Sequence, residues 1–167
     1  TYTVTVSPKL TYVFGQTLGD SLTVNMKTGR APKALSHGFS TFTVLDPTVK
    51  GALPLFTTNI DKLDMEVYQV SPEDWTAYKG YLYNYQRAYT PEDRQKLKPP
   101  GKRVAQKSVS IKGEPDKLVS TQVDISEYLD DNEGNLIVWI KDPAENNERY
   151  RRREFTTWVQ GTKLGLD

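Results

Sequence analysis

Histidine is the side chain that most often moves protons in enzymes, and this chain of 167 residues contains one, His37. A catalytic triad needs a serine and an acidic residue aligned with that ring, and no Gly-x-Ser-x-Gly motif accompanies it. Residues 35–38 therefore favour a histidine in a turn. A hydrolase that uses His37 or a pair of carboxylates stays open as an alternative, because sequence alone does not place two carboxylates across a cleft.

Residues 130–134, Asp-Asp-Asn-Glu-Gly, resemble a calcium-binding loop at first sight. If Gly134 took the sixth position of such a loop, the first ligand position would fall on Leu129, which has no side-chain oxygen. The chain also lacks cysteine, which excludes disulfides and thiolate zinc sites within it. We predict an acidic turn here, and no metal or cofactor bound by this chain.

Residues 149–153, Arg-Tyr-Arg-Arg-Arg, form the densest basic run of the chain. Glu145, Glu148 and Glu154 flank it, and the whole chain carries a formal net charge of only +1. A nucleic-acid-binding domain usually has a strongly basic face, so we expect no nucleic-acid partner. The run instead favours a charged edge or turn, which discourages pairing between strands of different molecules.

Aromatic side chains form the most distinctive local group of the sequence, between residues 75 and 89. Four apolar residues recur there at helical spacing and predict a stripe that packs on a sheet: Trp75, Tyr78, Leu82 and Tyr85. The remaining tyrosines of the group, Tyr81, Tyr83 and Tyr89, do not all fit on that stripe. They are candidates for contact with a neighbouring domain or partner, since tyrosine is enriched at protein interfaces.

A helix at this point has clear start signals. Ser71, followed by Pro-Glu-Asp, combines a capping residue, a proline for the first turn and carboxylates favoured by the helix dipole. Thr90 is followed by the same Pro-Glu-Asp sequence and predicts a second, short helix. Gly80 costs about 1 kcal/mol relative to alanine in a helix interior, which favours an early end of the first helix.

Most of the remaining chain alternates apolar and polar residues, the two-residue period of a half-buried strand. The alternation is clear in residues 2–6, 22–26 and 119–125, and each of these strands is expected to bury one face. Further strands are predicted at residues 39–45, 54–59, 63–70, 104–112 and 153–160. Residues 136–140 are apolar on both faces, which predicts a central strand covered on both sides.

Many short strands separated by turns indicate an all-β fold, an antiparallel β-sandwich of the macroglobulin, fibronectin-III or immunoglobulin type with a short helical insertion near residues 72–97. A chain of this length buries roughly two-thirds of its unfolded surface, enough for a real core. No run of residues approaches the roughly 20 apolar residues of a membrane-spanning helix, so no membrane contact is expected from this segment.

Two successive segments resemble bacterial alpha-2-macroglobulins: residues 53–60, Leu-Pro-Leu-Phe-Thr-Thr-Asn-Ile, and residues 63–70, Leu-Asp-Met-Glu-Val-Tyr-Gln-Val. In that family a similar sequence stands at the start of a macroglobulin-like domain. Residues 71–75 also resemble many members, and residues 153–166 look like the passage from one such domain into the next. Residues 1–30 are similar to the last strands of a preceding bacterial immunoglobulin-like module.

The resemblance implies three parts. Residues 1–32 would be the C-terminal strands of a preceding module or the first strands of the same sandwich, residues 33–160 the macroglobulin-like sandwich, and residues 161–167 the start of the next domain. The partners it implies are neighbouring domains of the same polypeptide, and proteases through the full-length protein.

The same resemblance implies a non-catalytic structural domain of a protease-trapping inhibitor, periplasmic or at the cell surface, whose parent is lipid-anchored in some members. Many members capture proteases through a Cys-x-Glu-Gln thioester, which cannot lie in a chain without cysteine. The alternative from another class is an adhesin-like or carbohydrate-binding sandwich that uses exposed tyrosines.

Overall fold

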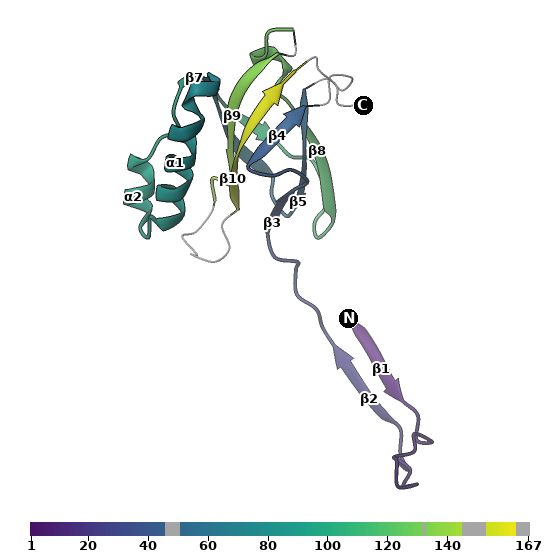
Figure 1. The fold of residues 1–167 in the computed structure, drawn as a ribbon. Helices are drawn as coiled ribbons and strands as arrows, with labels where there is room; N and C mark the ends of the chain where they lie inside the picture. The colour runs from purple at the N-terminus through teal and green to yellow at the C-terminus, as the bar shows by residue number, and fades with distance from the viewer. Residues whose placement is uncertain (46–50, 132, 145–152, 163–167) are drawn as a thin grey trace. The chain divides into compact units, whose positions relative to one another are not determined.

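The computed structural model describes residues 1–45, 51–131, 133–144 and 153–162 (Figure 1). The chain divides into two compact units, Thr1–Ala31 and Pro32–Asp167. The assignment of residues 1–32 to a preceding module and of residues 161–167 to a following one stays a prediction, and residues 163–167 lie outside the described part of the chain.

The first unit is a hairpin of β1 (Tyr2–Val6) and β2 (Leu22–Met26), which pair antiparallel with Val4 opposite Val24. Its apolar residues share one face, and all of the following are exposed: Tyr2, Val4, Leu22, Val24 and Met26. The prediction that these two strands bury one face is therefore wrong within the described residues. An isolated two-stranded hairpin is at best marginally stable in water.

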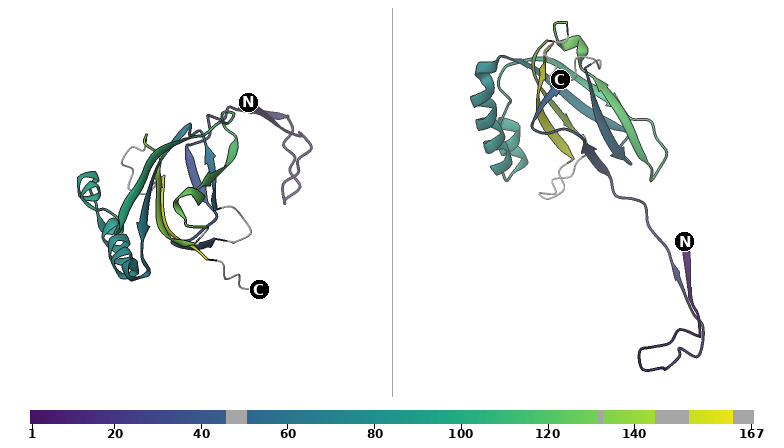
Figure 2. Two further views of the ribbon diagram at one scale, coloured as in Figure 1. Left: turned by 90° about the horizontal axis from the view of Figure 1, so that it is seen from above. Right: turned by 45° about the vertical axis from the view of Figure 1, so that its right-hand side comes forward.

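The second unit contains two sheets that face each other (Figure 2). The larger sheet has the order β4 (Phe42–Leu45), β10 (Glu154–Gly161), β9 (Gly134–Lys141), β6 (Lys62–Val70) and β7 (Lys102–Ser110). The smaller sheet has the order β3 (Ala34–His37), β5 (Ala52–Thr58) and β8 (Leu118–Asp124). Neighbouring strands are antiparallel, except that β4 runs parallel to β10. The predicted all-β sandwich is confirmed.

The space between the sheets holds the main hydrophobic core. It is built by the inward residues of both sheets, among them Leu53, Leu55, Leu63, Met65, Val67, Val123, Leu136, Val138, Ile140 and Val159. The short 3₁₀ helix η2 (Ser126–Tyr128) follows β8 and closes this core beside Ile125 and Leu129, which are both buried.

The helical insertion covers the outer face of the larger sheet. It comprises η1 (Pro72–Asp74), α1 (Trp75–Arg87) and α2 (Pro91–Lys96). Tyr78 of α1 is fully buried and packs with Ile137 of β9 and Trp158 of β10 in a second hydrophobic cluster. The predicted packing of the aromatic stripe on a sheet is confirmed.

Strand β9 explains why residues 136–140 are apolar throughout. Leu136, Val138 and Ile140 point into the core between the sheets, whereas Ile137 and Trp139 point toward α1. The prediction of a central strand covered on both sides is confirmed, because a helix layer lies where an ordinary sandwich meets solvent.

The helix starts follow the sequence signals, but the predicted early end of α1 is wrong. The backbone N–H of Ser71 donates to Asp74 Oδ2 at 2.9 Å, and the N–H of Asp93 donates to Thr90 Oγ1 at 3.1 Å. α1 continues through Gly80 to Arg87. Buried residues on both sides of Gly80, Tyr78 and Tyr81, provide packing that outweighs the weak helix preference of glycine.

Two boundaries near residues 34–45 were also mispredicted. His37 ends strand β3, where it lies opposite Leu55, and is not in a turn. Strand β4 begins at Phe42 and not at residue 39. The chain changes sheets between β3 and β4, and a period-two pattern does not mark that crossing. The other predicted strands after residue 50 begin and end within two residues of β5, β6, β7 and β10.

The packing of α1 predicts that a buried and an exposed tyrosine of this helix contribute differently to stability. Replacing Tyr78 by alanine is expected to lower the free energy of unfolding by about 3–5 kcal/mol, because it empties a buried aromatic site. Tyr83→Ala on the same helix is expected to change it by less than about 0.5 kcal/mol, since that ring is exposed. Urea denaturation followed by far-ultraviolet circular dichroism measures both; equal losses would contradict the helix-on-sheet packing.

Candidate functional site

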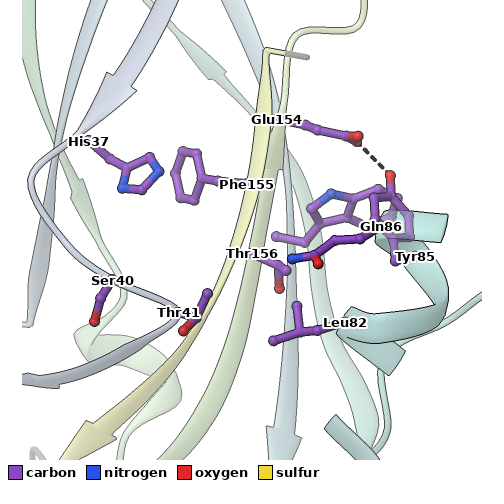
Figure 3. A pocket seen from close by; sticks show the side chains of 10 residues that line it. His37, Ser40, Thr41, Leu82, Tyr85, Gln86, Glu154, Phe155 and Thr156 are labelled. Carbon is purple, nitrogen blue, oxygen red and sulfur yellow. Dashed lines mark hydrogen bonds between the residues drawn. The ribbon is translucent and has the colours of Figure 1, made fainter. Parts of the chain in front are cut away.

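A cavity of about 500 Å³ opens beside strand β10, between α1 and the segment that joins β3 to β4 (Figure 3). His37, Ser40 and Thr41 line one side, and Leu82, Tyr85 and Gln86 of α1 line the other. Trp139 of β9 and Glu154, Phe155 and Thr156 of β10 complete the lining. The cavity combines aromatic walls with a few polar groups, the usual composition of a binding pocket.

Glu154 and Tyr85 form the main polar contact of this cavity. The Tyr85 hydroxyl donates to Glu154 Oε2 at 2.6 Å (Figure 3). Burial raises the pKa of Tyr85, and the hydrogen bond that its hydroxyl donates to the Glu154 carboxylate raises it further. Glu154 forms no ion pair with a described side chain. The cavity therefore contains one anionic group held in place by a neutral phenol.

His37 lies on the opposite wall. Its Nδ1 is 2.7 Å from the carbonyl oxygen of Phe39, which can only accept, so Nδ1 carries the hydrogen. The ring packs against Phe39 and Phe155, with centroid distances of 4.6 and 4.4 Å. Among the described residues, no serine or carboxylate hydrogen-bonds to this ring. The arrangement a catalytic triad needs is not assembled here.

The three tyrosines predicted as contact residues have different environments. Tyr81 is 6% exposed and lies within the helix–sheet cluster, so its ring presents almost no surface to a partner. Tyr83 and Tyr89 are 59% and 67% exposed. Arg87 stacks over Tyr83 at 5.0 Å from the ring centroid, and its Nη1 donates to the Tyr83 hydroxyl at 2.7 Å. A role of these residues in partner contact stays a prediction.

The charged segments noted in the sequence are described only in part. At the acidic segment, Asp130 forms a β-bridge with Glu133, and Asp131 adopts a positive φ of 48°, which agrees with the predicted turn. Arg153 Nε donates to the buried Asp142 at 2.7 Å. Residues 149–152 of the basic run lie outside the described residues.

The described residues contain neither a metal-binding cluster nor a membrane-spanning helix. No group of three or more histidine, aspartate or glutamate side chains there lies close enough to hold a metal ion. No helix there is long and apolar enough to cross a membrane.

Sequence reasoning did not identify the cavity. Glu154 was noted only as an acidic neighbour of the basic run, and Trp139 was assigned to a buried strand. No local motif joins these residues to His37 and Tyr85, because four separate elements bring them together.

The buried tyrosines of the helix layer predict instability in alkali. Burial raises the pKa of Tyr78 to about 12, whereas a tyrosine of the unfolded chain titrates near 10. The folded state therefore retains its proton over this range, and stability present below pH 10 is lost as pH rises toward 12. Denaturant titrations at pH 8 to 11.5 should show this fall, and Tyr78→Phe should make it shallower. A slope unchanged by this variant would contradict the assignment.

No protein-family model matches the sequence, and no curated protein matches it significantly. Solved structures do resemble this fold. Native alpha-2-macroglobulin from Escherichia coli spanning domains MG0-NIE-MG1 matches with a TM-score of 0.54 and 13% identity, over 99% of this chain and 50% of that one.

Two longer structures give the same result. The native conformation of the Escherichia coli protein matches with a TM-score of 0.55 and 13% identity, over 96% of this chain and 10% of that one. Salmonella alpha-2-macroglobulin reacted with methylamine matches with a TM-score of 0.57 and 14% identity, over 95% of this chain and 9% of that one. The chain spans half or less of these relatives, and the resemblance to bacterial alpha-2-macroglobulins is confirmed as a likeness of fold.

Proposed function

We propose that this chain is a non-catalytic structural domain of a bacterial alpha-2-macroglobulin-like inhibitor that traps proteases. The fold likeness over nearly the whole chain is the observation that carries the proposal. In this role the sandwich is a rigid body that positions other parts of a longer polypeptide. Protease capture would then belong to the full-length protein, in the periplasm or at the cell surface.

The interior of the second unit supports a mechanical role. Trp158, Ile137 and Tyr78 join the helix layer to the larger sheet, and the inter-sheet core joins that sheet to the smaller one. Each layer is thus fixed to the next by buried side chains, which resist the local opening that loosely packed regions allow.

The exposed face of the β1–β2 hairpin supports contact with neighbouring domains of the same polypeptide. Its five large apolar side chains are each between 43% and 63% exposed. Contiguous exposed apolar surface of this kind usually marks an interaction site. The proposal assigns this hairpin, with residues 1–32, to the junction with a preceding module.

A direct test uses the purified 167-residue chain and a panel of serine, cysteine and metalloproteases. We expect no inhibition on either a peptide or a protein substrate, because the chain contains no cysteine for a thioester and the proposed role is structural. The isolated chain should also stay folded and monomeric by circular dichroism and light scattering. Potent inhibition by the chain alone would contradict the scaffold role.

A second candidate is a carbohydrate-binding or adhesin-like module, and the exposure of Tyr83 and Tyr89 is the observation that favours it. Aromatic rings open to solvent can stack on apolar sugar faces. If the scaffold proposal holds, a glycan array probed with the chain should be silent. Binding that is lost in both Tyr83→Ala and Tyr89→Ala, but retained in the matched variant Tyr12→Ala, would favour the second candidate instead.

A further inference from the structure

Within the described residues, one edge of strand β10 has no paired strand over its first half. The N–H of Asp142 donates to the carbonyl of Arg153 on the β9 side, and the N–H of Trp158 donates to the carbonyl of Thr41 on the β4 side, both at 2.9 Å. Backbone groups of alternate residues point to opposite edges of a strand. Glu154 and Thr156, in phase with Trp158, therefore direct their N–H and C=O groups toward the β4 side.

No strand of the described residues pairs with that side of Glu154 or Thr156. The parallel pairing of β4 begins at Phe42, opposite Trp158, and continues away from residue 154. The chain that precedes β4 packs on Phe155 through the rings of His37 and Phe39, and it hydrogen-bonds to β10 at Thr157, whose Oγ1 donates to the carbonyl of Ser40 at 2.8 Å. Two backbone donors and two acceptors thus face an opening in the sheet edge.

The cavity of about 500 Å³ lies at this opening (Figure 3). Glu154 and Thr156 point toward α1, and Phe155 points the other way, toward His37. The space therefore has two sides that match the alternating side chains of an extended peptide. Unpaired sheet edges commonly accept such a peptide as an added strand.

The two sides of the cavity differ in chemistry. On the α1 side, the Glu154 carboxylate is fixed by Tyr85, and the Trp139 ring packs edge-on against Tyr85 at 5.9 Å. The Lys141 ammonium already lies 4.8 Å from the Trp139 ring centroid, and Lys141 is opposite Glu154 in the β9–β10 ladder without an ion pair to it. A partner's cation would therefore be received by the Glu154 carboxylate and not by the Trp139 ring. On the other side, Phe155 and Phe39 form an aromatic wall with His37. A basic side chain suits the first side, and an apolar one suits the second.

A second copy of this chain does not suit the same edge. Pairing two β10 edges would bring two Glu154 carboxylates to the same groove, and like charges opposite each other destabilise a sheet. A peptide with a basic residue at that position would instead neutralise the carboxylate. Charge complementarity therefore selects a different chain.

We propose that the open edge of β10 at residues 154–156 binds an extended segment of another polypeptide, whose basic side chain faces Glu154 and whose neighbouring apolar side chains face His37 and Phe155. The backbone of the segment pairs with Glu154 and Thr156. This site is separate from the structural role proposed above, and it involves no chemical step.

The test titrates the 167-residue chain with the fluorescein-labelled pentapeptide Val-Arg-Val-Arg-Val and follows fluorescence anisotropy. We expect saturable binding, together with amide chemical-shift changes at Glu154 and Thr156 in nuclear magnetic resonance spectra. Val-Glu-Val-Glu-Val is expected not to bind. A Val-Arg-Val-Arg-Val peptide N-methylated at alternate amides should also fail, because it cannot donate to the strand edge.

Two variants separate the side-chain and backbone contributions. Glu154→Gln keeps an acceptor for the Tyr85 hydroxyl and should weaken binding about fivefold, as expected for the loss of a partly exposed charge pair. Thr156→Pro removes a donor that faces the opening and not β9, a position that a proline at a sheet edge can occupy, and should abolish binding. Glu127→Gln, whose carboxylate is paired with Lys107 elsewhere on the domain, is the matched control and should bind normally.

The experiments with different peptides use the unchanged protein, so they test the proposal even if a variant does not fold. No binding of the basic peptide would overturn it. Equal binding of the N-methylated peptide would also overturn it, because contact would then not use the backbone of β10. Neither result bears on the protease panel, so a failure here stays distinct from a failure of the scaffold role.

Discussion

The domain depends on the burial of β9 on both faces. Leu136, Val138 and Ile140 fill the inter-sheet core, while Ile137 and Trp139 lie under the helix layer. A strand with apolar residues on both faces needs two covers, so the sandwich requires α1 as a third layer. Thr41 joins these layers at one point, since its carbonyl accepts the N–H of Trp158 and, at 3.3 Å, the hydroxyl of Tyr78.

The helix layer also determines where the sheet remains open. α1 packs on the outer face beside β10, and the β3–β4 segment hydrogen-bonds to β10 at Ser40, from where the chain continues into the paired strand β4. Between them lies a length of β10 that no described strand pairs with on this edge, and the cavity has a wall on either side of it. The same arrangement that covers the aromatic residues of β9 and β10 therefore shapes the cavity around Glu154.

Local patterns in the sequence were sufficient for most of the fold. Two-residue alternation predicted β8, short segments between turn residues predicted β5, β6 and β7, and the two Pro-Glu-Asp sequences predicted both helix starts, because each signal lies within one element or at its ends. The parallel pairing of β4 with β10 was beyond such patterns, since it joins segments more than a hundred residues apart. β3 was missed for a related reason: its four residues are too few to show a period.

The candidate site could not be predicted from the sequence, and the physical reason differs from the reason why β3 and the β4–β10 pairing were missed. A side chain's type says which ligand it favours, but an open strand edge is a property of the backbone and of what fails to pair with it. The sequence around Glu154 and Thr156 does not indicate that one strand edge is unpaired there, because the same residues could stand in a strand that is paired on both edges. Only the register, which starts at Phe42 opposite Trp158, shows that the ladder stops before it reaches them. Sites of this kind are found by following the hydrogen bonds of each strand in turn, and not by searching for reactive residues.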